Sequence, residues 1–257
     1  MDTTYGTEDQ RRLQAVSDTW AETAADTPGA AIVGRMRGTD DPEALGWNVI
    51  ADALAEDGAF GFRMIPVEQL DRIRDRLDTF GARLDTWLVY RGDRNTIADP
   101  SALSWPDGIS EVPVSDPSDE ATRAFQAAME TSGVVPFSGQ MLTGQFGPVT
   151  NAALARGGEI VATAHAYKPH VGDSPWRGLA WAGLISVAES ERGNGLGRFV
   201  NALIASKAIA LPGVSEVYQL VTKTNVVSQR MVEASGLSLD PEHVCGFAVR
   251  GGGRFTR

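Results

Sequence analysis

The stretch Val187-Ala-Glu-Ser-Glu-Arg-Gly-Asn-Gly-Leu-Gly197 decides the fold of this 257-residue chain. The residues before it predict a strand over Leu179–Val187, and apolar residues after it recur at helical spacing until Pro212. A strand therefore meets a helix through a turn rich in glycine. The backbone N–H groups of such a turn have no intrahelical acceptor and lie at the positive end of the helix dipole. The sequence thus predicts an anion site here, best matched to a phosphate or pyrophosphate.

The spacing of the glycines excludes two common phosphate-binding patterns. The dinucleotide pattern G-x-G-x-x-G fails because Arg198 stands where its third glycine would be, and no Gly-Lys-Ser/Thr opens the helix as in a P-loop. The segment Arg192-x-x-Gly195-x-Gly197 instead resembles the R/Q-x-x-G-x-G/A pattern of the GCN5-related N-acetyltransferases. The alternative is an ordinary glycine-rich turn between a strand and a helix.

A second segment, downstream of the loop, is also similar to that family. A strand is expected at Val217–Thr222, and Asn225-Val-Val-Ser228 then leads into a short helix that ends at Gly236-Leu237. This resembles the family's N-x-x-S/A…G-F/L segment at the usual distance from the loop. The resemblance covers about residues 111–250.

The resemblance implies an α/β (α+β) chain with the acyl-CoA N-acyltransferase fold: a mixed, mostly antiparallel central sheet flanked by helices, plus an N-terminal α/β extension. We expect residues 1–108 to be an N-terminal accessory region, 109–250 the acetyltransferase domain and 251–257 a flexible tail. The first region has no phosphate loop of its own. Whether it is a degenerate copy of the acetyltransferase unit is left open.

Periodicity and capping residues predict the remaining elements. In the first region these are a helix at Glu8–Ala24, a helix opened by Asp41-Pro42 and closed by Gly58, a strand at Phe60–Ile65, a helix at Pro66–Phe80 and a strand at Leu84–Arg91, with a linker from Gly92 to Gly108. In the second they are a strand at Ile109–Val114, a helix opened by Asp116-Pro117, strands at Pro148–Leu154 and Ile160–Tyr167, and a last strand at Val244–Val249.

Composition excludes several classes of protein and partner. The formal net charge of −10 argues against a nucleic-acid partner, because the phosphate backbone needs a basic surface, and it is compatible with a cationic substrate such as an amine. The sequence shows neither an apolar run long enough to span a membrane nor a leader, and Cys245, the only cysteine, allows no internal disulfide. We therefore expect a cytoplasmic protein without a membrane partner.

The resemblance implies acetyl-CoA as cosubstrate and no metal. The residues expected to bind it come from the end of the strand before the loop, from the loop itself and from the downstream segment: Ile185, Ser186, Val187, Arg192, Gly193, Asn194, Gly195, Leu196, Gly197, Asn225 and Ser228. Arg192 pairs either with a phosphate or with a neighbouring glutamate. Asn225 contacts the cosubstrate, caps the helix that follows, or does both.

The catalytic acid and base are less evident. The strand before the loop contains no carboxylate, and His165 on the neighbouring strand is the only nearby side chain with a suitable pKa, although a lone histidine in a strand is more often structural. Val232 stands where many relatives carry a tyrosine that protonates the departing thiolate. Tyr218, on an adjacent strand, is the candidate substitute.

The resemblance thus implies an acetyl-CoA-dependent N-acetyltransferase that transfers the acetyl group directly to a primary amine in a ternary complex. The alternative is a non-catalytic acyl-CoA-binding sensor or regulatory module of the same fold, and a third reading is transfer of another acyl chain. The acceptor is a small-molecule amine or a peptide whose identity the sequence does not reveal. A homodimer is left open.

Overall fold

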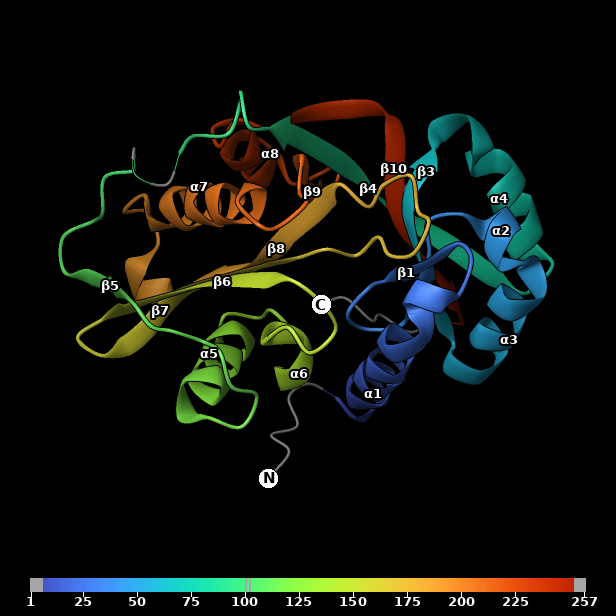
Figure 1. The fold of residues 1–257 in the computed structure, drawn as a ribbon, viewed down its shortest axis with the longest axis horizontal. Coiled ribbons are helices and arrows are strands. Elements are labelled where there is room, and N and C mark those ends of the chain that lie inside the picture. The colour runs from blue at the N-terminus through green and yellow to red at the C-terminus, as the bar shows by residue number, and fades with distance from the viewer. Residues whose placement is uncertain (1–6, 100, 102, 252–257) are drawn as a thin grey trace.

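The computed structural model describes residues 7–99, 101 and 103–251, and these build one ten-stranded sheet with helices on both faces (Figure 1). Neighbouring strands run antiparallel, except that β2 pairs with β3, and β8 with β9, in parallel. In sheet order the strands are β1 (Ala30–Ile32), β2 (Arg37–Thr39), β3 (Ala59–Pro66), β10 (Ser238–Arg250), β4 (Ala82–Asp93), β9 (Glu216–Val221), β8 (Leu179–Val187), β7 (Glu159–Tyr167), β6 (Val149–Arg156) and β5 (Ile109–Glu111).

Six of the helices cover the sheet in three groups. Figure 1 shows α7 on one side of strands β6–β8 and α5 with α6 on the other, while α2, α3 and α4 lie at the far end beside β3 and β10. Three of the buried apolar clusters follow this division. The helices are α1 (Glu8–Thr23), α2 (Pro42–Leu45), α3 (Trp47–Asp57), α4 (Leu70–Asp78), α5 (Glu120–Thr131), α6 (Gly139–Leu142), α7 (Leu196–Ile209) and α8 (Val226–Glu233).

Two capping predictions have different outcomes. Asp41 caps α2 as expected, because its side chain accepts hydrogen bonds from the Glu43 and Ala44 N–H groups; however, Gly46, with φ of 92°, separates α2 from α3, so the single helix expected here is wrong. The helix expected after Asp116 begins later. Asp119 is its N-cap and accepts from the Thr122 N–H at 2.7 Å.

The two halves of the chain share their central strands. Strand β10 lies between β3 and β4, and β4 in turn lies between β9 and β10. The residues expected as accessory region and acetyltransferase domain therefore form one continuous sheet. Because β10 pairs on both edges, it extends well beyond the strand expected at Val244–Val249.

The order of elements around this centre is repeated. The series β2, α3, β3, α4, β4 matches the series β8, α7, β9, α8, β10, and each contains one parallel strand pair and receives a central strand from the other. This correspondence favours the hypothesis of a degenerate second copy. Within the described ranges, no helix combines the length and apolar character that crossing a membrane requires. Most of the expected tail, residues 252–257, lies outside the described residues.

Candidate functional site

The site begins where β8 separates from β9. The parallel pairing of these strands covers only Leu179, Ala180 and Trp181 of β8, so the rest of that edge has no strand partner among the described residues. On its other edge β8 contains a bulge, because Ala164 of β7 faces both Leu184 and Ile185. Leu184 has φ of 52°, a conformation that is strained for this residue type. The bulge and the opening together leave backbone groups of β8 available to a ligand.

The glycine loop leads from this opened strand into α7. Gly195 is the N-cap, with φ of 82°, and no side chain caps the helix. The N–H groups of Leu196, Gly197 and Arg198 therefore have no intrahelical acceptor and lie at the positive end of the dipole. A Cβ at Gly195 would meet no atom within 4 Å, so within the protein the positive φ, rather than crowding, accounts for the glycine.

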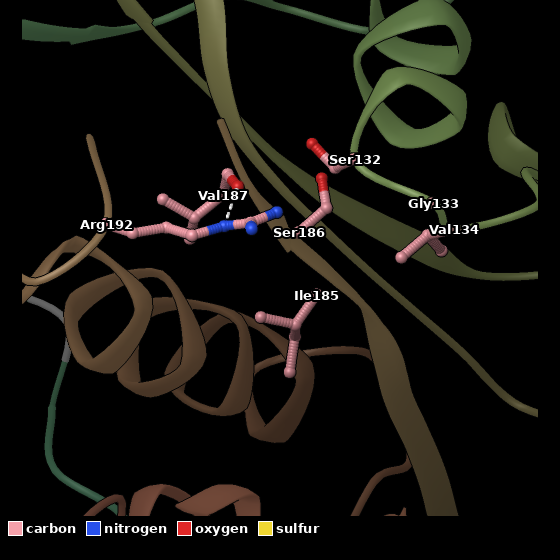
Figure 2. Close-up of a pocket in the computed structure, with 7 residues that line it drawn as sticks. All are labelled: Ser132, Gly133, Val134, Ile185, Ser186, Val187 and Arg192. Carbon is pink, nitrogen blue, oxygen red and sulfur yellow. Dashed lines mark hydrogen bonds between the residues drawn. The ribbon is translucent and has the colours of Figure 1, made fainter. Parts of the chain in front are cut away.

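A cavity of about 640 Å³ lies beside the loop (Figure 2). The expected residues Ile185, Ser186, Val187 and Arg192 line one side, and the segment after α5 lines the other with Ser132, Gly133 and Val134. The Arg192 side chain extends past Val187 and donates from Nε to the Val187 carbonyl at 3.1 Å (Figure 2). It forms no ion pair with a described carboxylate; of the two neighbouring glutamates, Glu191 pairs with Arg156 at 2.8 Å.

A second cavity, of about 370 Å³, adjoins the first, since Val134 and Ile185 line both. Its walls are largely apolar and include Trp87, Phe137, Trp181 and Phe247. Thr222, Asn225 and Ser228 supply neutral polar groups, and Arg35 and Arg63 supply two guanidinium groups.

The downstream segment, Asn225 to Ser228, contributes both of these residues to the lining of the second cavity, and Asn225 also caps helix α8. The Asn225 side chain accepts a hydrogen bond from the Ser228 N–H at 3.1 Å and so caps α8. The capping interpretation of Asn225 therefore holds. Its position on the cavity wall also leaves the predicted ligand contact open to it.

His165 and Tyr218 lie in the core, outside the linings of both cavities. His165 is fully buried, hydrogen-bonds through Nδ1 to Asn151 Oδ1 at 2.8 Å, and burial lowers its pKa to about 3. Burial raises the pKa of Tyr218 well above its ordinary value, and its hydroxyl has no hydrogen-bond partner among the described residues. These surroundings suit packing roles. Val232, at the position of the missing tyrosine, is likewise a core residue, 2% exposed.

Two residues of the site were missed from the sequence. Arg35 lies between β1 and β2, and Arg63 lies within β3, which was expected only as a strand. An arginine in the middle of an apolar strand was the available signal, because a buried charge requires a partner or a function. The described residues contain no group of three or more histidine, cysteine or acidic side chains that could hold a metal ion.

Comparison with known proteins finds relatives by structure but not by sequence. No protein-family model matches the chain, and no protein of curated function is similar to it in sequence. Solved structures do match. A GCN5-related N-acetyltransferase from Kribbella flavida superimposes with a TM-score of 0.60 at 15% identity, over 94% of this chain and 95% of that one. The chain has the GCN5-related N-acetyltransferase fold.

Two further structures support the acetyltransferase fold. A GCN5-related N-acetyltransferase from Sphaerobacter thermophilus matches with a TM-score of 0.51 at 19% identity, over 84% of this chain and 68% of that one. A GCN5-related N-acetyltransferase-like protein from Streptococcus suis matches with a TM-score of 0.51 at 14% identity, over 95% and 99% of the two chains. The matches from Kribbella flavida and Streptococcus suis thus include most of the N-terminal region.

Proposed function

We propose that the protein is an acetyl-CoA-dependent N-acetyltransferase that transfers the acetyl group directly to a primary amine. One observation carries this proposal: the uncapped N-terminus of α7 follows directly on a strand that has opened away from its neighbour, beside two adjoining cavities. This arrangement offers a phosphate site and a reaction space in one continuous path.

The residues along this path fit acetyl-CoA. The free N–H groups at the start of α7 suit the pyrophosphate, as does the Arg192 guanidinium, which forms no ion pair with a described carboxylate. The open edge of β8 near Ile185 suits the pantetheine arm, and a backbone N–H there would polarise the thioester carbonyl. Acetyl-CoA supplies the acetyl group as an activated thioester, with coenzyme A as the leaving group.

The amine must reach its neutral, nucleophilic form without the help of a side-chain base. Neither cavity is lined by a described carboxylate or histidine, whereas Arg35 and Arg63 both line the second. A cation in a desolvated pocket disfavours a second positive charge and so lowers the pKa of a bound amine. The two arginines would thus favour the neutral, nucleophilic amine. As its nitrogen bonds to the acetyl carbon and the C–S bond breaks, one N–H proton would pass to water and from water to the coenzyme A thiolate.

The second candidate is a non-catalytic acyl-CoA-binding module of the same fold. The absence of a side-chain base from the described linings favours it. Under this reading the same loop binds the acyl-CoA, but no acceptor is consumed.

Thiol release distinguishes the two candidates. The protein is incubated with acetyl-CoA and a panel of free amines, amino acids, polyamines and peptides, and the free thiol is measured against a control without acceptor. Acceptor-dependent release together with a product heavier by one acetyl group supports the enzyme. Tight CoA binding by calorimetry without turnover on any acceptor supports the sensor. A parallel series with longer acyl-CoA donors tests the acyl preference.

A further inference from the structure

The second cavity contains two positive charges for which the described residues provide no carboxylate partner. Arg63 is only 2% exposed, and its Nε and Nη1 atoms are buried without a hydrogen-bond partner. The Nε atom of Arg35 is also buried and has no hydrogen-bond partner among the described residues. Neither arginine forms an ion pair with a carboxylate in the part of the chain that the structure describes. In this cavity the protein therefore leaves two guanidinium groups unneutralised.

The aromatic neighbours offset only part of the cost of burying these charges. The Arg35 guanidinium lies 5.2 Å from the Phe137 ring centre, that of Arg63 lies 5.6 Å from Phe247, and Arg35 also donates a hydrogen bond to the Val135 carbonyl. Cation–π contacts contribute less than a buried ion loses on leaving water. Burial, together with the smaller effect of the Arg63 charge, lowers the pKa of Arg35 to about 10, so Arg35 still carries its charge at neutral pH.

A third unsatisfied group indicates the kind of ligand that is missing. Trp181 also lines this cavity, and its Nε1–H is buried without an acceptor. The buried, unpartnered polar atoms that the lining side chains contribute are thus all donors: Arg35 Nε, Arg63 Nε, Arg63 Nη1 and Trp181 Nε1. A ligand that satisfies them must offer several acceptor atoms and a negative charge, which is the chemistry of a carboxylate.

These charges do not belong to the phosphate site of the cosubstrate. Arg35 and Arg63 line the second cavity only, whereas the glycine loop and Arg192 border the first, and the two cavities meet at Val134 and Ile185. The ligand that meets the arginines therefore enters from the acceptor side.

We propose that the acceptor amine carries a carboxylate that Arg63 and Arg35 bind, and that its remaining part is apolar. Trp87 and Phe137 furnish apolar walls, and the volume of about 370 Å³ suits a compact molecule such as a free α-amino acid with an apolar side chain. A phosphate dianion is more strongly hydrated and would be costlier to bury among these aromatic walls. The inference rests on the proposed function, since it specifies the acceptor of that reaction.

The carboxylate also agrees with the activation of the amine. One bound carboxylate neutralises one of the two guanidinium charges, so a net positive charge remains beside the amine. That charge continues to disfavour the ammonium form. The same pair of arginines thus binds one end of the substrate and activates the other.

The test compares each acceptor with its decarboxylated partner. L-leucine is assayed against 3-methylbutylamine and L-phenylalanine against 2-phenylethylamine, with O-phosphoethanolamine as the phosphate-bearing probe. The wild type should favour the carboxylated member of each pair in kcat/KM. Arg63→Met should lower kcat/KM for the amino acids by about 10- to 100-fold more than for the simple amines, the value of one charge-assisted contact, because the simple amines lose only the effect of the charge on the pKa of the amine. Arg63→Lys should retain part of the preference, and Arg94→Met, at an exposed turn, should retain all of it.

Three results would overturn the inference: a wild-type preference for the decarboxylated amines, a preference for the phosphate probe, or an equal loss on both members of a pair in Arg63→Met. A purely structural role for Arg63 predicts a lower melting temperature in Arg63→Met, whereas removal of an unneutralised buried charge predicts an unchanged or higher one.

A binding measurement separates this inference from the proposed function. Calorimetry in the presence of CoA compares N-acetyl-L-leucine with N-(3-methylbutyl)acetamide, which lacks the carboxylate. Binding of N-acetyl-L-leucine that Arg63→Met abolishes would support the carboxylate site even in a protein that turns over no amine. Equal binding of the two compounds would refute the site even in an active enzyme.

Discussion

Substitution of Gly195 tests the phosphate site without disturbing the fold. The position is exposed, and a new Cβ would meet no atom within 4 Å, so a side chain can be added without displacing its neighbours. The φ of 82° costs a non-glycine residue about 1 kcal/mol, and asparagine and aspartate tolerate this conformation better than other residues. Gly195→Asn and Gly195→Asp therefore carry a similar strain and similar bulk, and differ by one negative charge.

That charge should weaken CoA binding selectively. A carboxylate about 5 Å from a phosphate charge costs roughly 1 to 3 kcal/mol at effective dielectric constants between those of water and of a protein surface. By calorimetry we therefore expect Gly195→Asp to bind CoA about 5- to 100-fold more weakly than Gly195→Asn. The melting temperature of Gly195→Asp should be no lower than that of Gly195→Asn, because a negative charge stabilises a helix N-terminus.

Pantetheine, which lacks the pyrophosphate, is the matched control ligand. It should bind both variants equally. Equal CoA affinity in the two folded variants, or an equal loss for pantetheine, would show that the glycine loop does not bind the phosphates.

Three further outcomes are expected. A chain beginning at Gly108 lacks β4, which pairs with both β9 and β10, so it should show no cooperative thermal transition by circular dichroism; a sharp transition would contradict the shared sheet. The folded-state pKa of His165, about 3, lies below its unfolded value of 6.5, so the unfolded state binds more protons between these values. The free energy of unfolding therefore decreases as the pH is lowered through that window. The free energy of unfolding is measured by urea titration at about pH 6 and pH 4. Between these two conditions it should decrease by about 1.4 kcal/mol less per pH unit in His165→Gln than in the wild type. An equal decrease in both proteins would argue against a buried neutral imidazole. Arg35→Gln removes a positive charge beside the amine, so the pH profile of kcat should shift to higher pH. An unshifted profile would exclude Arg35 from amine activation.

Local features of the fold could be predicted from the sequence. The spacing of Gly193, Gly195 and Gly197 after an apolar strand determines a turn in which N–H groups are free, and this depends on no distant residue. Caps such as Asp41 and Gly58 are likewise encoded within a few residues.

The pairing of distant strands could not be predicted in the same way. The exchange of β4 and β10 between the two halves depends on contacts between residues far apart in the chain, which no short pattern records. Strands β1 and β2 have only three residues each, too few for an alternating pattern to be visible.

The acceptor side of the site was missed for a similar reason. Arg35 and Arg63 meet only because β3 and the segment before β2 come together at the opening of β8, and neither belongs to a motif. The acidic overall charge suggested a cationic substrate, whereas the cavity itself is positive. Net charge describes the surface, and the charge of a cavity depends on the few side chains that line it.

Acetyl transfer in a single turnover is the measurement that tests the account most directly. The protein is mixed with stoichiometric acetyl-CoA, labelled in the acetyl group, and with an excess of an apolar amino acid, and both the thiol and the labelled product are quantified. The account predicts one N-acetylated amino acid for each thiol released, and little release when the decarboxylated amine replaces the amino acid. CoA binding without any labelled product, across the whole acceptor panel, would contradict the proposal that this protein is an N-acetyltransferase.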